Sequence, residues 1–246
     1  MKKKTVAVIM TAVMAMGMVS AVSVQAGVED KTLIVGFDAE YPPYGYMDEN
    51  GEYTGFDLEL AQAVCDIEGW ELVKKPINWD SKDMELNSGS IDCIWNGFTM
   101  NGREDDYTFS EPYVDNSQVI VVSEASGIEK LTDLAGKTVG VQAASAALDL
   151  LNSEEEGGQK ALADTFGALN EFADYNTAFT ELQAGALDAL AIDVGVAKYQ
   201  LNSRGEGFKI LDETLNTEQY AIGFKKGNTE LCDIVNTDLQ KLADDG

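Results

Sequence analysis

Short apolar runs alternate with amphipathic stretches along most of the chain. Apolar runs rich in β-branched residues predict buried strands, and apolar positions repeating every three or four residues predict helices. The pattern predicts strands at 31–37, 71–76, 91–95, 137–141, 171–175, 187–192 and 220–224. It predicts helices at 57–68, 83–87, 144–152, 177–184 and 231–243, and a hairpin at 46–53 with an Asn50-Gly51 turn. We expect Asp57 to cap the first helix and Gly69 to end it.

A helix–glycine–strand stretch occurs twice. LNSGSIDCI at 86–94 matches LQAGALDAL at 182–190 in its Leu, Gly and Asp positions, and each copy has the same place in a β-α-β-α-β run. The sequence therefore predicts an α/β protein with two lobes of similar construction, each a mostly parallel sheet with covering helices. We expect extended segments near Val119–Ser123 and Leu215–Tyr220 to connect the lobes, and two such crossings form a hinge.

The first 26 residues have the layout of a secretory signal peptide. Three lysines at 2–4 precede an uncharged apolar run at 6–22, and Val24-Gln25-Ala26 follows with small residues at the cleavage-determining positions. An uncleaved membrane anchor is the alternative. No Cys follows the apolar run, and no later stretch is apolar enough to cross a bilayer. We expect a soluble protein exported to the periplasm or the extracellular face of the envelope.

The charge balance excludes several classes of function. The chain carries 43 acidic and 17 basic residues and no His, a net charge of −26, which becomes −29 without the three lysines of the first segment. Because a chain this acidic repels phosphate and anionic membranes, we expect no nucleic-acid partner. Without His, His-based triads and metal sites are excluded.

Other motifs of catalysis and cofactor binding are missing. The sequence has no Walker loop, GxSxG, CxxC or dinucleotide fingerprint, so we expect neither a cofactor nor a metal. The three cysteines, at 65, 93 and 232, lie in segments that resemble core elements. We interpret them as buried and unpaired, with one disulfide between two of them as the alternative.

Polar and aromatic residues gather where four predicted strands end. In parallel α/β sheets, ligands bind beyond the carboxyl ends of the strands. These ends lead into the segments 38–46, 96–103 and 142–146, and the fourth ends at Asp193. If the lobes face each other, the four segments meet in one cleft.

The residue types in these segments suit a zwitterion. Arg103 can grip a carboxylate with two parallel hydrogen bonds, and Asp38 and Asp193 can pair with a cation. The helix beginning at Ser145 favours an anion, while Tyr41, Tyr44 and Trp79 supply apolar walls. Taken singly, each has an ordinary alternative: helix cap, surface arginine or core aromatic. Their common location carries the argument.

The ordered segments resemble the extracellular solute-binding proteins of family 3, the polar amino-acid receptors of ABC importers. The resemblance covers nearly all of residues 31–246. It rests on LIVGFDAEYPPYGY (33–46), GEYTGFDLELAQAV (51–64), WDSKDMELNSGSIDCIWNGFTM (79–100), FSEPYV (109–114), LTDLAGKTVGVQAAS (131–145), LDALAID (187–193) and EQYAIGFKKG (218–227).

The resemblance implies a type II, periplasmic-binding-protein-like fold. Its two α/β lobes would be residues 31–120 plus 219–246 and residues 121–218, joined by a two-crossing hinge. It implies a monomer that binds an amino-acid ligand and partners a membrane permease. The implied ligand-binding residues are Asp38, Tyr41, Trp79, Asn96, Gly97, Phe98, Thr99, Arg103, Gln142, Ser145, Ala146 and Asp193.

Their implied roles follow the two ends of an amino acid. Arg103 would clamp the α-carboxylate with help from Ser145, and Asp193, Thr99 and the Gly97 carbonyl would meet the α-ammonium. Asp38 and Tyr41 would line the side-chain end, and Trp79 would stack on the ligand. With no basic residue expected beyond Arg103, the pocket should take a polar or cationic amino acid rather than an acidic one.

The chain departs from the family pattern in three places. The spacing from Thr99 to Arg103 is one residue shorter than the commoner spacing, and 143–146 reads AASA where Gly and Ser/Thr are usual. The family usually continues with a last aromatic-bearing helix, so we expect truncation at Gly246. Two alternative functions remain open: a cyclohexadienyl dehydratase-like enzyme, for which Glu40 is the one suggestive acid, and a sensory ligand-binding domain.

Overall fold

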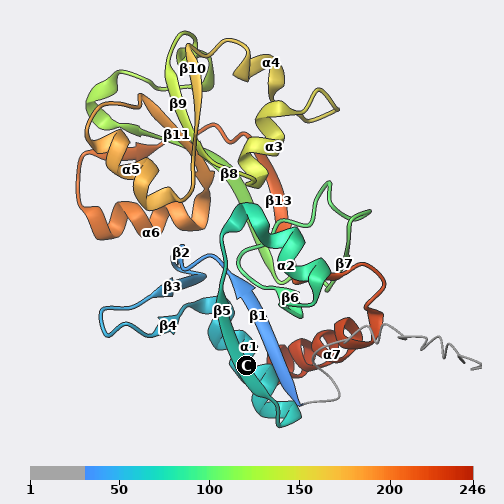
Figure 1. The fold of residues 1–246 in the computed structure, drawn as a ribbon. Helices are drawn as coiled ribbons and strands as arrows, with labels where there is room; N and C mark the ends of the chain where they lie inside the picture. The colour runs from blue at the N-terminus through green and yellow to red at the C-terminus, as the bar shows by residue number, and fades with distance from the viewer. Residues whose placement is uncertain (1–30, 246) are drawn as a thin grey trace, which may run out of the picture.

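The computed structural model describes residues 31–245, and the predicted signal peptide lies outside this range. The described chain forms two α/β lobes, drawn one above the other in Figure 1. The lower lobe contains a five-stranded sheet, the upper lobe a six-stranded sheet, and a small three-stranded sheet lies on the side of the lower lobe that faces the upper one.

The first sheet combines a parallel centre with an antiparallel edge. Its spatial order is β5 (Glu71–Pro76), β1 (Thr32–Phe37), β6 (Cys93–Ile94), β14 (Gly223–Lys225) and β7 (Tyr107–Phe109). β1 pairs in parallel with β5 and β6, and β14 is antiparallel to β6 and β7. Because side chains alternate along β1, Leu33 and Val35 join one apolar cluster and Ile34 joins the opposite one.

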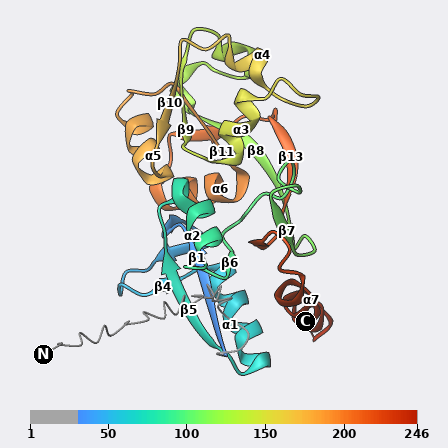
Figure 2. The ribbon, with the colours of Figure 1, turned by 45° about the vertical axis from the view of Figure 1, so that its right-hand side comes forward.

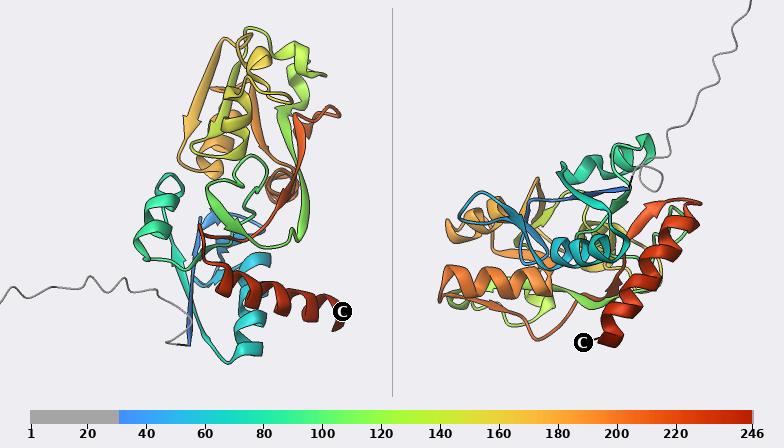
Figure 3. Two further views of the ribbon diagram at one scale, coloured as in Figure 1. Left: turned by 90° about the vertical axis from the view of Figure 1, so that its right-hand side faces the viewer. Right: turned by 90° about the horizontal axis from the view of Figure 1, so that it is seen from below.

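Helices cover both faces of this sheet. α1 (Phe56–Glu68) and α7 (Thr229–Asp245) pack on the Leu33 face and lie beside each other (Figure 3), whereas α2 (Lys82–Ser88) packs on the other face. The short 3₁₀ helix η1 (Trp79–Ser81) precedes α2. The small sheet consists of β2 (Glu40–Tyr41), β3 (Gly45–Met47) and β4 (Tyr53–Thr54).

The second sheet has the same kind of centre. Its order is β10 (Ala168–Phe172), β9 (Thr138–Gln142), β11 (Ala189–Asp193), β8 (Val114–Ser123) and β12 (Phe208–Ile210), and β13 (Asn216–Tyr220) also pairs with β8. β9 is parallel to β10 and β11, and β8 is antiparallel to its three partners. The helices of this lobe are α3 (Ala146–Asn152), α4 (Lys160–Ala163), α5 (Tyr175–Gln183) and α6 (Val194–Arg204), with the 3₁₀ helices η2 (Glu124–Ser126) and η3 (Leu131–Leu134).

The expected connection at Val119–Ser123 is wrong. These residues form the end of β8, where 119–122 are buried and pair with β11 and β12. Such a run of β-branched apolar residues belongs in a sheet interior, not in a connection. The expected lobe boundaries at 120 and 219 therefore fall inside β8 and β13, which lie side by side (Figure 2). The chain leaves the first sheet after Phe109 and re-enters it at Gly223.

Most predicted elements are confirmed, with shifted ends. The strand expected at 91–95 shortens to β6, and the one at 220–224 divides between β13 and β14. Gly69 ends α1 in the left-handed conformation as expected, but Gly55, not Asp57, precedes the helix. Asp57 is fully buried, and its carboxylate accepts a hydrogen bond from the Gly97 N–H.

Two further expectations concern the whole described chain. The three cysteines are buried and free, so the disulfide alternative does not apply in this structure. None of the helices between residues 31 and 245 is both long and apolar enough to pass through a membrane.

Candidate ligand-binding site

The strand ends of the two lobes meet in one small pocket. Nine residues line it, all of them among the predicted ligand-binding residues: Tyr41, Trp79, Gly97, Thr99, Arg103, Gln142, Ser145, Ala146 and Asp193. The first five come from the first lobe and the other four from the second. The pocket is narrow, with a volume of about 10 Å³, which is space for about one water molecule. In this arrangement the lobes are pressed together.

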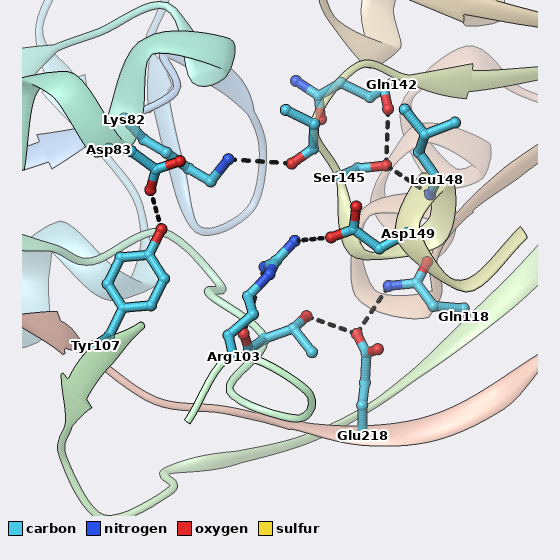
Figure 4. Close-up of polar contacts among 12 residues, drawn as sticks. Lys82, Asp83, Arg103, Tyr107, Gln118, Gln142, Ser145, Leu148, Asp149 and Glu218 are labelled. Atoms are coloured by element: carbon cyan, nitrogen blue, oxygen red, sulfur yellow. Dashed lines mark hydrogen bonds and ion pairs between the residues drawn. The ribbon is translucent and has the colours of Figure 1, made fainter. Parts of the chain in front are cut away.

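Arg103 links the lobes across this pocket (Figure 4). Its Nη2 atom lies 2.7 Å from Oδ2 of Asp149 in α3, and its Nη1 donates a 3.4 Å hydrogen bond to the Thr99 carbonyl. The guanidinium carbon lies 5.0 Å from the centre of the Phe98 ring, in cation–π geometry. The sequence analysis did not identify Asp149 as a site residue. A helix that begins after Ser145 places residue 149 one turn along, on the same face, and this spacing is the signal that could have found it.

Lys82 is a second cation beside Arg103. Its side chain, which Figure 4 shows, is buried. Its Nζ donates a 3.3 Å hydrogen bond to the Ala144 carbonyl of the second lobe and lies 5.4 Å from the centre of the Trp79 ring. Burial and the nearby charge of Arg103 lower the pKa of Lys82. Lys82 lies beside the pocket but does not line it, so among the described residues that line the pocket Arg103 is the one basic group, as expected. Lys82 directly precedes the helix predicted at 83–87, where a lysine ordinarily faces solvent, but here it contacts the second lobe.

Ser145 begins α3, as predicted. Its hydroxyl accepts a 3.2 Å hydrogen bond from the Leu148 N–H and donates a 2.7 Å bond to the Gln142 carbonyl. Because this hydroxyl caps the helix, the backbone of the turn, rather than the hydroxyl, is available to a ligand. Gln142 reaches across the lobes, since its Nε2 donates a 2.7 Å hydrogen bond to Oδ2 of Asp38.

Asp193 belongs to a buried polar network. Its Oδ1 accepts hydrogen bonds from Asn116 (2.8 Å), Gln118 (2.7 Å) and the Tyr220 hydroxyl (2.6 Å). Oε1 of Glu218 accepts bonds from the same two amides and from the Thr99 hydroxyl, which lies 2.8 Å away. Burial and the charge of Asp193 raise the pKa of Glu218, while these hydrogen bonds partly offset the rise.

Sheet register places this network at the pocket. Gln118 of β8 stands opposite Asp193 of β11, and Asn116 stands opposite Glu218 of β13. Residues two apart in a strand point to the same face, so the polar pairs 116/118 and 218/220 follow a spacing visible in the sequence. Sequence analysis missed them because polar residues on alternate strand positions ordinarily face solvent. Here they face the other lobe.

A larger cavity of about 540 Å³ adjoins the pocket at Trp79. Among residues 31–245 its lining includes no Lys or Arg but five acidic residues: Asp38, Glu40, Asp80, Glu85 and Asp174. Burial raises the pKa of Asp38 to about 6, although hydrogen bonds from Glu40 and Gln142 lower it. The nearby charges of Asp174 and Glu40 raise it further. This cavity is therefore the acidic end of the site.

Asn96 and Phe98 do not line either cavity. Both are buried: Phe98 packs edge-on against Trp79 and Tyr107, and the Asn96 side chain has no hydrogen-bond partner within residues 31–245. Asp38 lines the larger cavity and bonds to Gln142 at its border with the pocket. Across the described chain, no group of His, Cys, Asp and Glu side chains has the geometry to hold a metal ion.

Comparison with known proteins places this geometry in a family. The sequence model of the bacterial extracellular solute-binding proteins, family 3, matches residues 33–246. The L-cystine-binding protein TcyJ of Escherichia coli (strain K12) is 28% identical over 246 residues, which cover 95% of this chain and 89% of that protein. The arginine-binding extracellular protein ArtP of Bacillus subtilis (strain 168) is 33% identical over 220 residues, with coverages of 88% and 82%.

A solved structure has the same fold. It is an ABC uptake transporter substrate-binding protein from Streptococcus pneumoniae with bound histidine. It superposes with a TM-score of 0.83 at 34% identity and covers 89% of each chain.

Proposed function

The chain belongs to the bacterial extracellular solute-binding proteins of family 3, and we propose that it captures a polar or cationic amino acid and delivers it to an ABC-transporter permease. One observation carries the proposal: the pocket between the lobes is lined by the guanidinium of Arg103 from the first lobe and by the carboxylate of Asp193 from the second. The named relatives bind cystine and arginine, and the related solved structure holds histidine.

The two ends of the pocket suit the two charges of an amino acid. Arg103, with Lys82 nearby, supplies the positive end for the α-carboxylate, where a guanidinium forms paired hydrogen bonds. Asp193 and the Thr99 oxygen supply the negative end for the α-ammonium. The groups come from different lobes, so neither lobe alone provides the whole site.

The acidic cavity points to a cationic side chain. A ligand held by its α-groups would extend past Trp79 toward Asp38, and the cavity beyond carries five acidic residues. A guanidinium or ammonium would be favoured there and a second carboxylate disfavoured. We therefore propose that a long cationic side chain, as in arginine, fits best, with glutamine and cystine weaker and glutamate and aspartate excluded.

Closure of the lobes is the binding step that we propose. Gln142–Asp38, Arg103–Asp149 and Lys82–Ala144 all bridge the lobes. A ligand touching both lobes adds contacts that only the closed arrangement offers, so it shifts the population toward closure. We place the two crossings of the hinge at 110–113 and 221–222, between the strands of the two sheets.

The remaining parts of the proposal concern location and chemistry. We propose that the protein is exported, acts as a monomer and catalyses no reaction. Glu40, the acid considered for a dehydratase, is exposed, accepts a hydrogen bond from Asn176, and lines the acidic cavity rather than the strand-end pocket. Incubation with prephenate or arogenate should therefore yield no product.

A thermal-shift screen against the twenty amino acids and cystine tests the function. A ligand at 100 times its Kd stabilises the folded protein by about 2.7 kcal/mol. Arginine and lysine should raise the melting temperature most, and glutamate and aspartate should leave it unchanged. Competition calorimetry should then rank the ligands. If glutamate displaces arginine at equal concentration, the assignment of the acidic cavity is wrong.

A further inference from the structure

Asp193 and Glu218 form one compact acidic centre beside the pocket. Nδ2 of Asn116 lies 2.8 Å from both Asp193 Oδ1 and Glu218 Oε1, and Nε2 of Gln118 lies 2.7 Å from both. One nitrogen reaches two oxygens at such distances only when the oxygens are close neighbours. Both side chains are buried, but only Asp193 lines the pocket. Figure 4 shows Glu218 bonded to Gln118, and Glu218 also accepts a hydrogen bond from the Thr99 hydroxyl.

No cation balances this centre within residues 31–245, since neither carboxylate forms an ion pair there. Arg103, the cation of the pocket, is bonded to Asp149 and to the Thr99 carbonyl instead.

The other titratable groups around the centre are tyrosines from three elements and one turn. Burial raises the pKa of each of them, so all four are neutral near pH 7: Tyr41 of β2, Tyr44 of the turn that follows β2, Tyr175 of α5 and Tyr220 of β13.

Two ionised carboxylates in contact away from water repel each other strongly. A proton on one of them removes the repulsion, and so does a cation bound between the lobes. Three hydrogen bonds to Oε1 of Glu218 reduce the cost of ionisation, but the pKa of Glu218 stays above its ordinary value because of burial and the charge of Asp193. An ammonium arriving at Asp193 would cancel that charge.

We propose that Glu218 is a positioning residue that holds a proton in the ligand-free protein and releases it when an amino-acid ammonium binds at Asp193. The inference rests on the proposed function, because it needs an ammonium at that carboxylate. The carboxylic acid of Glu218 becomes a carboxylate, and its proton passes to the buffer. The ionised Glu218 then accepts a hydrogen bond from the Thr99 hydroxyl, and the Thr99 oxygen can accept a hydrogen bond from the ammonium.

Calorimetric titration with L-arginine tests the proton release. Titrations at pH 5–8, a range that begins near the ordinary pKa of a glutamate, are each run in two buffers of different ionisation enthalpy and measure the protons released on binding. We expect a fraction of one proton to leave. Because the bound form holds fewer protons, affinity should fall as the pH falls, by at most about tenfold for each pH unit.

Three variants identify the group that releases the proton. Glu218→Gln keeps an acceptor for the Thr99 hydroxyl but has no acidic proton. The proton release and the pH dependence of affinity that we assign to Glu218 should therefore vanish in this variant. Glu213→Gln, in an exposed loop of the same lobe, is the matched control and should behave as wild type. Asp38→Asn removes the other carboxyl of the site whose pKa is raised, and proton release should persist in this variant.

The wild-type titration can overturn the proposal even if a variant fails to fold. Arginine binding without proton release across pH 5–8 overturns the role of Glu218 and leaves the proposed function intact. Release that persists in Glu218→Gln but vanishes in Asp38→Asn overturns it too, because the proton then comes from the side-chain end. Failure of every amino acid to bind overturns both proposals.

Discussion

The two lobes share one framework, a parallel sheet centre with a helix–glycine–strand segment, but they differ in the residues that follow its strands. In the first lobe the Ile34 N–H donates a 2.8 Å hydrogen bond to the carboxylate of Asp92, and in the second the Thr138 N–H donates an equal bond to Asp188. Gly89 and Gly185 end the preceding helix segments in the left-handed conformation. The helix–glycine–strand repeat seen in the sequence is therefore a repeat of hydrogen bonds as well.

Packing is repeated with the same closeness. A Cβ atom on Gly36 would lie 2.4 Å from Cδ1 of Ile91, and one on Gly140 would lie 2.5 Å from Cδ1 of Leu187. In each lobe, the glycine of the first parallel strand leaves room for a large apolar side chain to pack over the sheet. That side chain is Ile91, directly before Asp92, in the first lobe and Leu187, directly before Asp188, in the second. The framework thus tolerates little variation at these positions.

Beyond the framework the lobes diverge. β6 leads into a loop that presents Gly97, Thr99 and Arg103, whereas β11 ends directly at Asp193. The first lobe supplies a cation and aromatic walls, and the second supplies a carboxylate. The comparison teaches that the repeat fixes where groups are presented, while the residues after each strand decide what they bind. The next three tests probe this division, beginning with the ligand groups.

Removal of Arg103 or Asp193 should have the largest effect. Truncating one partner of a desolvated charge pair costs roughly 2–5 kcal/mol, so Arg103→Ala or Asp193→Ala should weaken arginine binding about 30-fold or more at 1.4 kcal/mol per tenfold. Calorimetry gives the affinities, and urea unfolding checks that the fold persists. Asp149→Asn is the control, because its side chain is 64% exposed and such pairs are worth about 0–1 kcal/mol. Wild-type affinity in either alanine variant would refute that residue's assignment.

Gly195 offers a test of how closely the lobes meet. A Cβ atom here would lie 2.3 Å from Oη of Tyr44, which belongs to the other lobe. Overpacking of this kind costs about 1–3 kcal/mol, so Gly195→Ala should weaken arginine binding by up to about 100-fold. Solution scattering should show less contraction on adding arginine than in wild type.

A second substitution checks the cause of that loss. Tyr44→Phe removes the clashing oxygen, so the double variant should regain part of the lost affinity. If Gly195→Ala binds and contracts like the wild type, the closed arrangement differs from the one described.

The framework aspartates should affect stability rather than binding. Asp92→Ala and Asp188→Ala each remove a charged acceptor from a backbone N–H, a loss of about 1–3 kcal/mol. We expect the larger loss of unfolding free energy for Asp92, which is 6% exposed, because the side chain of Asp188 is 43% exposed. Urea unfolding without ligand measures both losses. Arginine affinity should stay near wild type in both variants, and a specific loss of affinity would contradict the division between framework and ligand groups.

Much of this site could be predicted because strand ends are readable from sequence. Buried apolar runs locate the strands, and the polar residues after them, such as Thr99 and Asp193, then fall at one edge. The strand ends, together with the resemblance to the family, predicted all nine residues that line the pocket. The parallel sheet centres were equally visible, because βαβ units force that pairing.

What the sequence hid depends on contacts between the lobes. Lys82 and Asp149 look like solvated helix residues until the opposite lobe covers or pairs them. Glu218 looks like the outward side of an edge strand. The run at 119–122 was misplaced because an apolar run shows burial but not the sheet in which the strand is buried. Asp57 was misread as a cap because its partner, the Gly97 N–H, is forty residues away.

The position of β14 has a consequence for the order in which the protein can be assembled. This strand lies between β6 and β7 in the first sheet, yet it follows the entire second lobe in the chain. Until it is synthesised, β6 has an unpaired edge and α7 is missing from the cover of the first lobe. The first lobe to emerge from the ribosome is therefore the last to be completed. For a chain that we propose to be exported, this delay keeps the early part incompletely folded while the rest is still being made.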